Sequence, residues 1–136
     1  MDEKFCIKAV RVLKIACGTD IIEIERIKKS IEELDDKFLN RIFSEEEIKY
    51  CESHKEAKYE HYAARFAVKE ATFKAINKVK EEDYLDWKKY KVSNLESGKP
   101  QIHIEDEELR KKIEDIDISI SHCRNYAMAT VVIIYN

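Results

Sequence analysis

The sequence predicts one α+β domain that covers residues 1–136, with helices in the first half and antiparallel strands in the second. Three observations carry this prediction. Apolar residues recur at helical spacing within residues 23–77. β-Branched runs separated by turn signals fill residues 90–135. The chain has 136 residues, two glycines, one proline and no internal repeat, so nothing divides it into two domains.

The first half contains one predicted strand and three predicted helices. Residues 10–22 are mostly apolar and β-branched, which predicts a buried strand. Apolar positions at helical spacing predict a helix over residues 23–34. Ser44 and Glu47 have the spacing of a capping box, so a short helix is expected to begin there. The longest predicted helix covers residues 55–77.

The second half is predicted to be a set of strands joined by turns. A Gly-Lys-Pro turn signal at residues 98–100 indicates a hairpin. The expected elements are strands over 90–94 and 101–104, a short charged helix over 107–113, and strands over 117–122 and 126–135. Consecutive strands that connect through short turns are antiparallel, which favours the α+β class.

Composition excludes several functional classes. The net charge of −3 does not fit a broadly basic nucleic-acid binder. No apolar run reaches membrane-spanning length and the first residues do not resemble a signal peptide, so we expect a cytoplasmic protein with neither membrane nor nucleic acid as a partner. The four cysteines lack the spacing of a metal site and are predicted to be free buried thiols.

The long helix carries a carboxylate in an aromatic stripe. At 100° per residue, Glu70 falls in a narrow stripe together with Tyr59, Tyr62, Ala63, Phe66 and Phe73. We therefore expect Glu70 to enter the interior or an interface, where an unpaired charge is costly and requires a cation. Lys74, one turn away, could supply that cation as an internal ion pair, so this alternative stays open.

A second carboxylate raises the same question. Asp20 ends the apolar run of the first strand, where aspartate has a poor strand propensity. One alternative is that Asp20 caps the following helix. The other is that Asp20 and Glu70 meet at a hard cation. Magnesium suits such a pair, because it binds few carboxylates and completes its shell with water and phosphate oxygens.

Cationic side chains surround these positions. Arg65, Lys69 and Lys74 flank Glu70 on the long helix, which suits a substrate with several phosphates, although a solvated helix face is the simpler interpretation. His122 ends a predicted strand. A structural histidine is the more common case there, but its position before a turn also allows a contact with phosphate.

Taken in order, these segments resemble the holo-acyl carrier protein synthases, the small-chain 4′-phosphopantetheinyl transferases. The similarity extends from about residue 15 to residue 134. The matching segments are GTDIIEIERI at 18–27, RIFS at 41–44 with Glu47, RFAVKEA at 65–71 with Lys74-Ala75, GKP at 98–100, and SISH at 119–122 followed by Tyr126-Ala127 and Ala129.

The resemblance implies a function. The protein is expected to transfer the 4′-phosphopantetheine group of coenzyme A to a serine of apo acyl carrier protein in fatty acid biosynthesis, releasing 3′,5′-adenosine bisphosphate. Mg²⁺ is the implied cofactor. A homotrimer with each active site between two subunits is the implied assembly. Two alternatives stay open: a non-catalytic trimer that binds carrier protein, and another magnesium-dependent nucleotide enzyme.

The same resemblance implies roles for individual residues. Asp20 and Glu70 are the expected magnesium ligands, and Arg26 is the expected contact with the carrier protein. The base that accepts the serine proton stays open between Glu70, Asp20 through water, and His122. The expected catalytic residues are Asp20, Glu70, Lys74 and His122, and the expected coenzyme A contacts are Arg65, Lys69, Lys74, Gly98, Pro100 and His122.

Residues 77–80 depart from the family pattern. The family usually has a glycine-containing loop beside coenzyme A at this point, and this sequence has none there. Our hypothesis is that Lys78 and Lys80 supply charge where a glycine would allow close backbone contact. The first ten residues have no counterpart in the shortest members.

Overall fold

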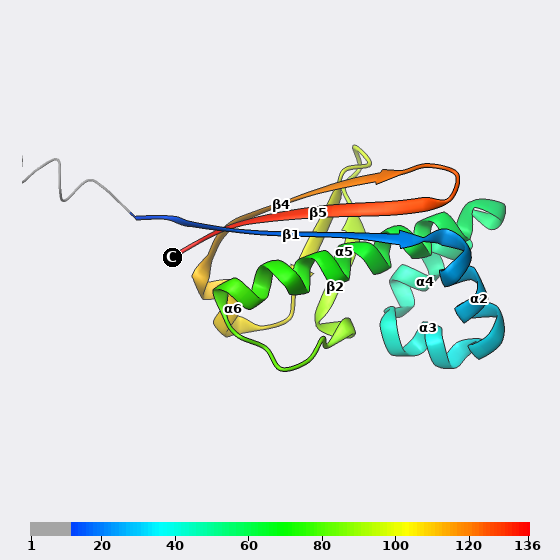
Figure 1. Cartoon of the computed structure of the whole chain (residues 1–136), viewed down its shortest axis with the longest axis horizontal. Coiled ribbons are helices and arrows are strands. Elements are labelled where there is room, and N and C mark those ends of the chain that lie inside the picture. The colour runs from blue at the N-terminus through cyan, green and yellow to red at the C-terminus, as the bar shows by residue number, and fades with distance from the viewer. Residues whose placement is uncertain (1–11) are drawn as a thin grey trace, which may run out of the picture.

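The computed structural model describes residues 12–136, and Figure 1 shows the arrangement of their elements. An α+β fold is observed, as the sequence predicts. The strands are β1 (Lys14–Glu23), β2 (Tyr90–Asn94), β3 (Pro100–Ile104), β4 (Ile113–His122) and β5 (Tyr126–Tyr135). The helices are α2 (Ile24–Leu34), α3 (Asp36–Ile42), α4 (Glu45–Glu52), α5 (Lys58–Val79) and α6 (Glu107–Lys112), with 3-10 turns η1 (Lys55–Ala57) and η2 (Trp87–Lys89).

The main sheet is antiparallel and has the strand order β1-β5-β4. The first and last described strands therefore pair, with Asp20 opposite Ala129. The sequence predicts helices in the first half of the chain and strands in the second. The pairing refines this division, because β1 from the first half joins the sheet that β4 and β5 form in the second half. The predicted hairpin is confirmed as β2 and β3, which form a separate two-stranded sheet. Gly98 takes a φ of 90° in its turn, a conformation that favours glycine.

Helix α5 packs directly against one face of the main sheet (Figure 1). Its contact face is made of small side chains, and Ala67, Ala71 and Ala75 are fully buried. Opposite them, a Cβ atom placed on Gly18 would lie 1.9 Å from the carbonyl oxygen of Ala71. Helix and strand therefore touch through their main chains, and only glycine fits at position 18.

The helices α2, α3 and α4 gather at one end of α5 (Figure 1). Their apolar side chains form a second core cluster that includes Ile27, Phe43 and Tyr62. The capping box of α4 is confirmed: Ser44 N donates to Glu47 Oε1 at 2.8 Å, and Glu47 N donates to Ser44 Oγ at 3.2 Å. Helix α3 was not predicted, because it follows α2 directly through Asp35, whose φ is 49°.

The predicted burial of the first strand was wrong. Strand β1 begins at Lys14 and is covered on one face only, so that Ile15 and Ile21 are each 60% exposed. Residues 12–13 of the predicted span do not join the strand, and residues 10–11 lie outside the described residues. On α5, the aromatic stripe is only partly buried: Tyr62 is buried, whereas Phe66 and Phe73 are half-buried. The alanine face lies deeper, because small side chains let the helix approach the sheet.

The cysteines are free but not uniformly buried. Cys17 and Cys123 are exposed, and only Cys51 is buried among the described cysteines. Burial raises the pKa of the Cys51 thiol to about 12, which makes it a weak nucleophile. The prediction of buried thiols was therefore wrong for Cys17 and Cys123, and Cys6 lies outside the described residues.

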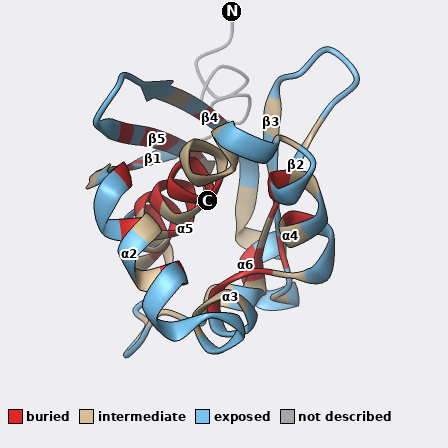
Figure 2. Ribbon diagram, turned by 90° about the vertical axis from the view of Figure 1, so that its right-hand side faces the viewer, coloured by how far each residue is buried: buried red, intermediate tan, exposed pale blue. Residues whose placement is uncertain are grey.

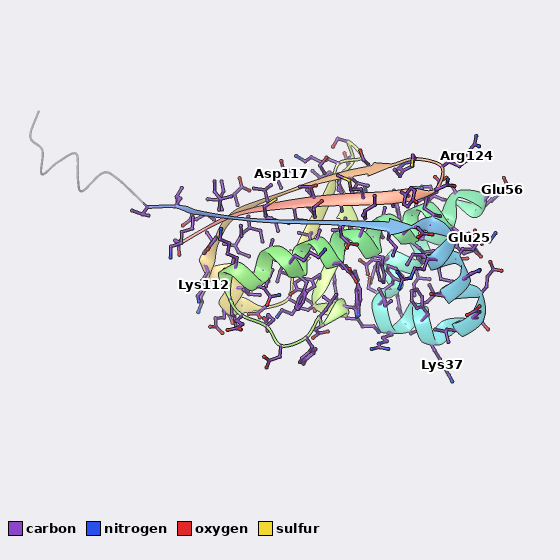
Figure 3. The ribbon with its side chains drawn as sticks, viewed as in Figure 1. Glu25, Lys37, Glu56, Lys112, Asp117 and Arg124 are labelled. Carbon is purple, nitrogen blue, oxygen red and sulfur yellow. The ribbon has the colours of Figure 1, made fainter. Side chains whose placement is uncertain are left out.

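Buried residues concentrate on α5 and on the strand faces that it covers (Figure 2). Charged side chains such as Lys37, Glu56 and Arg124 project from the surface (Figure 3). None of the helices within residues 12–136 has the length and apolar character needed to cross a bilayer.

Candidate active site

The contact between Gly18 and Ala71 brings two carboxylates together. Asp20 follows Gly18 by two residues on the covered face of β1, and Glu70 precedes Ala71 on α5. Both line a cavity of about 450 Å³, which we call the Asp20 cavity. Its lining residues are Asp20, Ile21, Ile22, Arg26, Ile27, Ser30, Phe38, Phe66 and Glu70.

Asp20 does not cap a helix. The N-cap of α2 is Glu23, so the capping alternative was wrong. The side chain of Asp20 is only 11% exposed, and its Oδ2 atom is buried without a hydrogen-bond partner within residues 12–136. A buried carboxylate oxygen without a donor is unfavourable, and a cation would relieve it.

Glu70 is half-buried beside Asp20. Its pKa is raised, mainly by burial, then by the charge of Asp20, and by a hydrogen bond that Glu70 can donate to Asp20 only when it is protonated, while Lys74 and Arg26 partly oppose the rise. Two carboxylates in hydrogen-bonding range repel each other when both are ionised. The pair thus has the chemistry of a divalent-cation site.

Lys74 contacts Asp20 rather than forming the expected ion pair with Glu70. Its Nζ donates to the carbonyl oxygen of Thr19 at 2.9 Å and to Oδ1 of Asp20 at 3.3 Å. The side chain of Lys74 remains 54% exposed, so its ammonium also stays accessible to a ligand. Arg26, which is exposed on α2, lines the same cavity.

A second cavity, of about 420 Å³, lies between α5, the β2–β3 hairpin and β4. We call it the Arg65 cavity. Four of the residues predicted to bind coenzyme A meet there. Its lining residues are Tyr50, Glu60, His61, Ala64, Arg65, Asn94, Gly98, Pro100, Ile118, Ser119, Ile120 and His122.

Arg65 is the main cation of this cavity. It is 3% exposed, its Nη2 donates to Oδ1 of Asn94 at 2.7 Å, and its guanidinium lies 3.9 Å from the ring centroid of Tyr50. Asn94 in turn donates through Nδ2 to the carbonyl oxygen of Gly98 at 3.0 Å. In the part of the chain that the structure describes, the buried Nε atom of Arg65 has no partner, so a charged donor is available for an anion.

Two histidines share this cavity. His122 stands at the end of β4 with its side chain 54% exposed, and its Nδ1 lies 4.0 Å from Oε2 of Glu60. It is therefore not a core histidine, and its contact with phosphate stays a prediction. His61 stacks on His54 with ring centroids 3.7 Å apart. Burial, followed by His54 and Arg65, lowers the pKa of His61.

Lys69 was predicted to contact coenzyme A, but it lines neither the Asp20 cavity nor the Arg65 cavity. The residue is fully buried, and its Nζ donates to Ile42 O and to Glu47 Oε1, both at 2.7 Å. This face of α5 turns toward α4 and β2, so the position of Lys69 does not support a phosphate contact.

The lysines of residues 77–80 also have protein partners. Lys78 Nζ donates to the carbonyl oxygen of Ile15 at 3.0 Å. Lys80 pairs with Glu108 at 3.0 Å and with Asp106 at 3.6 Å. Neither lysine lines the Arg65 cavity, so the hypothesis that they replace a glycine loop gains no support.

Sequence reasoning missed several lining residues of the Arg65 cavity, among them Tyr50, His61 and Asn94. Tyr50 and His61 lie on different helices, and no local pattern joins them. Asn94 is the last residue of β2, and only the position of the hairpin shows that it meets Arg65. All three depend on contacts distant in sequence.

Comparisons with known proteins agree with this geometry. The profile of the 4′-phosphopantetheinyl transferase superfamily matches residues 16–131. A holo-[acyl-carrier-protein] synthase of Thermodesulfovibrio yellowstonii is 48% identical over 116 residues, which is 85% of this chain and 95% of that relative. One from Ruminiclostridium cellulolyticum is 39% identical over 127 residues, or 89% of this chain and 92% of the relative.

Solved structures show the same fold. The holo-[acyl-carrier-protein] synthase of Helicobacter pylori in complex with coenzyme A aligns with a TM-score of 0.73 at 32% identity, covering 86% of this chain and 98% of that one. The corresponding synthase of Bacillus anthracis aligns with a TM-score of 0.74 at 31% identity, covering 92% and 100%. This chain therefore belongs to the holo-acyl carrier protein synthases, which transfer phosphopantetheine from coenzyme A to apo acyl carrier protein.

Proposed function

We propose that Asp20 and Glu70 hold a magnesium ion for this transfer and that the Arg65 cavity binds the nucleotide end of coenzyme A. The observation that carries the metal proposal is the buried Oδ2 of Asp20, which lacks a donor beside the raised-pKa carboxyl of Glu70. Within residues 12–136 no three His, Cys, Asp or Glu side chains are grouped as a metal site. Two carboxylates suit magnesium, which keeps waters and phosphate oxygens as its other ligands.

The proposed chemistry assigns a task to each group. Magnesium, when bound, neutralises charge on the pyrophosphate of coenzyme A. Lys74, beside Asp20, adds a cation at the same place, and Arg65 and His122 hold phosphate oxygens in the other cavity. The carrier serine oxygen forms a bond to the β-phosphorus as the bond from that phosphorus to the leaving phosphate oxygen breaks. The serine proton passes to a base, and 3′,5′-adenosine bisphosphate leaves.

The identity of the base is not assigned, but the candidates differ in basicity. The pKa of Glu70 is raised, so it accepts a proton more readily than an ordinary carboxylate. Asp20 acting through a bound water and His122 stay as the other candidates.

We also propose a homotrimer in which two subunits form each site. No side chain lines both cavities. Arg65 and Glu70 are five residues apart on α5, which places them about 140° apart around the helix. The outer face of the main sheet provides an apolar surface for another subunit. Its exposed apolar residues include Ile15, Ile21, Tyr126, Met128 and Val132.

Intact mass spectrometry tests the magnesium dependence. Apo acyl carrier protein is incubated with coenzyme A, Mg²⁺ and either wild type, Asp20→Asn or Glu70→Gln. We expect a mass gain of one phosphopantetheine with wild type, and loss of that gain with EDTA or in either variant. Glu105→Gln is the matched control, because Glu105 pairs with Lys91 on the surface, 2.8 Å away. Undiminished transfer by Asp20→Asn in Mg²⁺ would refute the metal assignment.

Sedimentation analysis tests the assembly. Wild type is expected to sediment as a trimer, and Ile15→Asp as a smaller species with little activity. Ile15 is 60% exposed in the isolated chain and lines neither cavity, so the substitution leaves the monomer fold and both cavities intact. A monomeric wild type with full activity would contradict the shared site.

Arg26 is proposed to contact the carrier protein, because it is exposed at the mouth of the Asp20 cavity. Residues 1–136 are proposed to act as one domain. A cytoplasmic location and a place in fatty acid biosynthesis stay predictions. Membership of the synthase family sets aside the two alternatives, a non-catalytic trimer and an enzyme for another nucleotide.

A further inference from the structure

One buried carboxylate joins three elements beside the Arg65 cavity. Oε1 of Glu47 accepts from Lys69 Nζ at 2.7 Å and from Ser44 N at 2.8 Å. Oε2 of Glu47 accepts from the backbone N–H of Val92 at 2.9 Å. Glu47 thus connects the start of α4 and the Lys69 side chain of α5 to the middle of β2.

Glu47 and Lys69 form an ion pair that is closed off from solvent. Glu47 is 2% exposed and Lys69 is 0% exposed, and the remaining bond of Lys69 Nζ goes to the carbonyl oxygen of Ile42. Burial lowers the pKa of Lys69, while Glu47 opposes that fall by charge and by hydrogen bonding. An ammonium enclosed in this way cannot touch a coenzyme A phosphate in the observed conformation.

Helix α5 and strand β2 also meet at a second contact, which lies at the Arg65 cavity. Arg65 lies one helical turn before Lys69, and Asn94 lies two residues after Val92. Arg65 Nη2 donates to Asn94 Oδ1 at 2.7 Å, at the wall of the Arg65 cavity. The two contacts therefore form an inner and an outer connection between helix and hairpin, and the inner one contains no cavity-lining residue.

We propose that Lys69 and Glu47 are positioning residues for coenzyme A. They hold β2 against α5 so that Asn94 and Gly98 stand at the right distance from Arg65. Lys69 acts through Glu47 and Val92 and makes no contact with the substrate. This inference rests on the proposed function of the Arg65 cavity as the nucleotide site.

The test removes the tie without leaving a buried charge. Lys69→Met alone would strand the Glu47 carboxylate and destabilise the fold, whereas replacing both members of a buried ion pair by apolar residues is often close to neutral. In the double variant Lys69→Met/Glu47→Leu we expect the KM for coenzyme A and the Kd for 3′,5′-adenosine bisphosphate to rise by about tenfold or more, equivalent to ~1.4 kcal/mol. The kcat at saturating coenzyme A should stay within about threefold, because no group that touches the reacting atoms has changed.

A second variant and a matched control complete the experiment. Glu47→Gln keeps the shape of the side chain but replaces one of its two acceptor oxygens by an NH2 donor, so it loses only part of the connection, and we expect a smaller rise in the same KM. The control Lys91→Met/Glu105→Gln removes an ion pair that links β2 to the residue after β3, not to α5. It should leave the KM for coenzyme A within about twofold.

Three results would overturn the proposal. If the folded double variant and Glu47→Gln both keep the wild-type affinity for coenzyme A, the ion pair contributes only to the stability of the fold. A collapse of kcat at constant KM would mean that Lys69 acts on the reacting atoms. An equal loss of affinity in the Lys91→Met/Glu105→Gln control would show general loosening of the hairpin. Failure of the proposed function is distinct: Arg65→Met would then leave coenzyme A affinity at the wild-type value.

Discussion

The Nζ atom of Lys74 lies 3.3 Å from Oδ1 of Asp20, whereas Oδ2 of the same carboxylate is buried without a partner among the described residues. The two oxygens of Asp20 thus differ: one accepts from Lys74, and the other is the oxygen proposed above to bind magnesium. The ammonium of Lys74 also holds the carbonyl oxygen of Thr19 at 2.9 Å, so it fixes the strand as well as the side chain.

Lys74→Met is expected to lower kcat on the order of 100-fold, because it removes a cation beside the proposed magnesium ligands. Steady-state kinetics with varied coenzyme A and carrier protein measures this effect. Lys78→Met is the matched control: Lys78 lies one turn further on α5 and bonds to Ile15 O. We expect the control to stay within about twofold of wild type, and an equal loss in both variants would contradict a specific role for Lys74.

Glu70→Gln is expected to stabilise the metal-free protein at pH 7. The raised pKa of Glu70 means that the folded state binds its proton more readily than the unfolded chain, so the ionised side chain costs stability above its ordinary pKa of 4.5. The Tm of Glu70→Gln should exceed that of wild type by a few degrees at pH 7, and this difference should become smaller as the pH falls toward 4.5. Thermal unfolding in EDTA at several pH values measures it.

Added magnesium provides the complementary measurement. We expect Mg²⁺ to raise the Tm of wild type and to leave that of Glu70→Gln nearly unchanged, because the variant lacks one proposed ligand. A variant less stable than wild type in EDTA at pH 7 would show that the Glu70 carboxylate is satisfied without a cation.

Gly18→Ala is expected to destabilise the fold by about 3 kcal/mol or more, because its Cβ would meet the carbonyl oxygen of Ala71 at 1.9 Å. Gly98→Ala is the control: its φ is 90°, but a Cβ there meets no atom within 4 Å. The cost at Gly98 should be about 1 kcal/mol. Denaturant unfolding compares the two, and equal costs would contradict backbone contact at Gly18.

His61 is expected to make the protein acid-sensitive. Its pKa lies below the ordinary 6.5, so between 6.5 and that lower value the unfolded chain binds a proton that the folded protein does not. The stability contributed by neutral His61 is present above pH 6.5 and is lost as the pH falls toward the lower value. His61→Phe, which keeps the ring, should flatten this part of the stability curve. An unchanged slope would assign the acid sensitivity to other groups.

Much of the fold was predictable because the signals were local. The capping box at Ser44, the long helix and the hairpin each depend on residues close in sequence. Helix α3 was missed, since a non-glycine residue, Asp35, makes the turn after α2. The burial of β1 was overestimated, because an apolar pattern does not reveal that only one face of the sheet is covered within the chain.

The candidate site was predictable where family motifs marked it. Asp20 and Glu70 line one cavity and Lys74 contacts Asp20, whereas Arg65, Gly98, Pro100 and His122 line another cavity. Lys69 shows the limit of a motif: it adjoins Glu70 in sequence but points about 100° away around the helix, into the core. Its partner Glu47 carries a recognisable cap pattern, yet nothing local indicates that the same carboxylate also binds Lys69 and Val92.

The main-chain contact of Gly18 with Ala71 has a consequence for ion selectivity. Side-chain rotamers do not set the separation between β1 and α5 at this point, because backbone atoms already touch there. Asp20 and Glu70 inherit that separation, and with it the radius of any cation that the proposed magnesium site could hold. Discrimination between a small ion such as Mg²⁺ and a larger one such as Ca²⁺ would then be tuned by the alanines of α5, without any change to the ligands themselves.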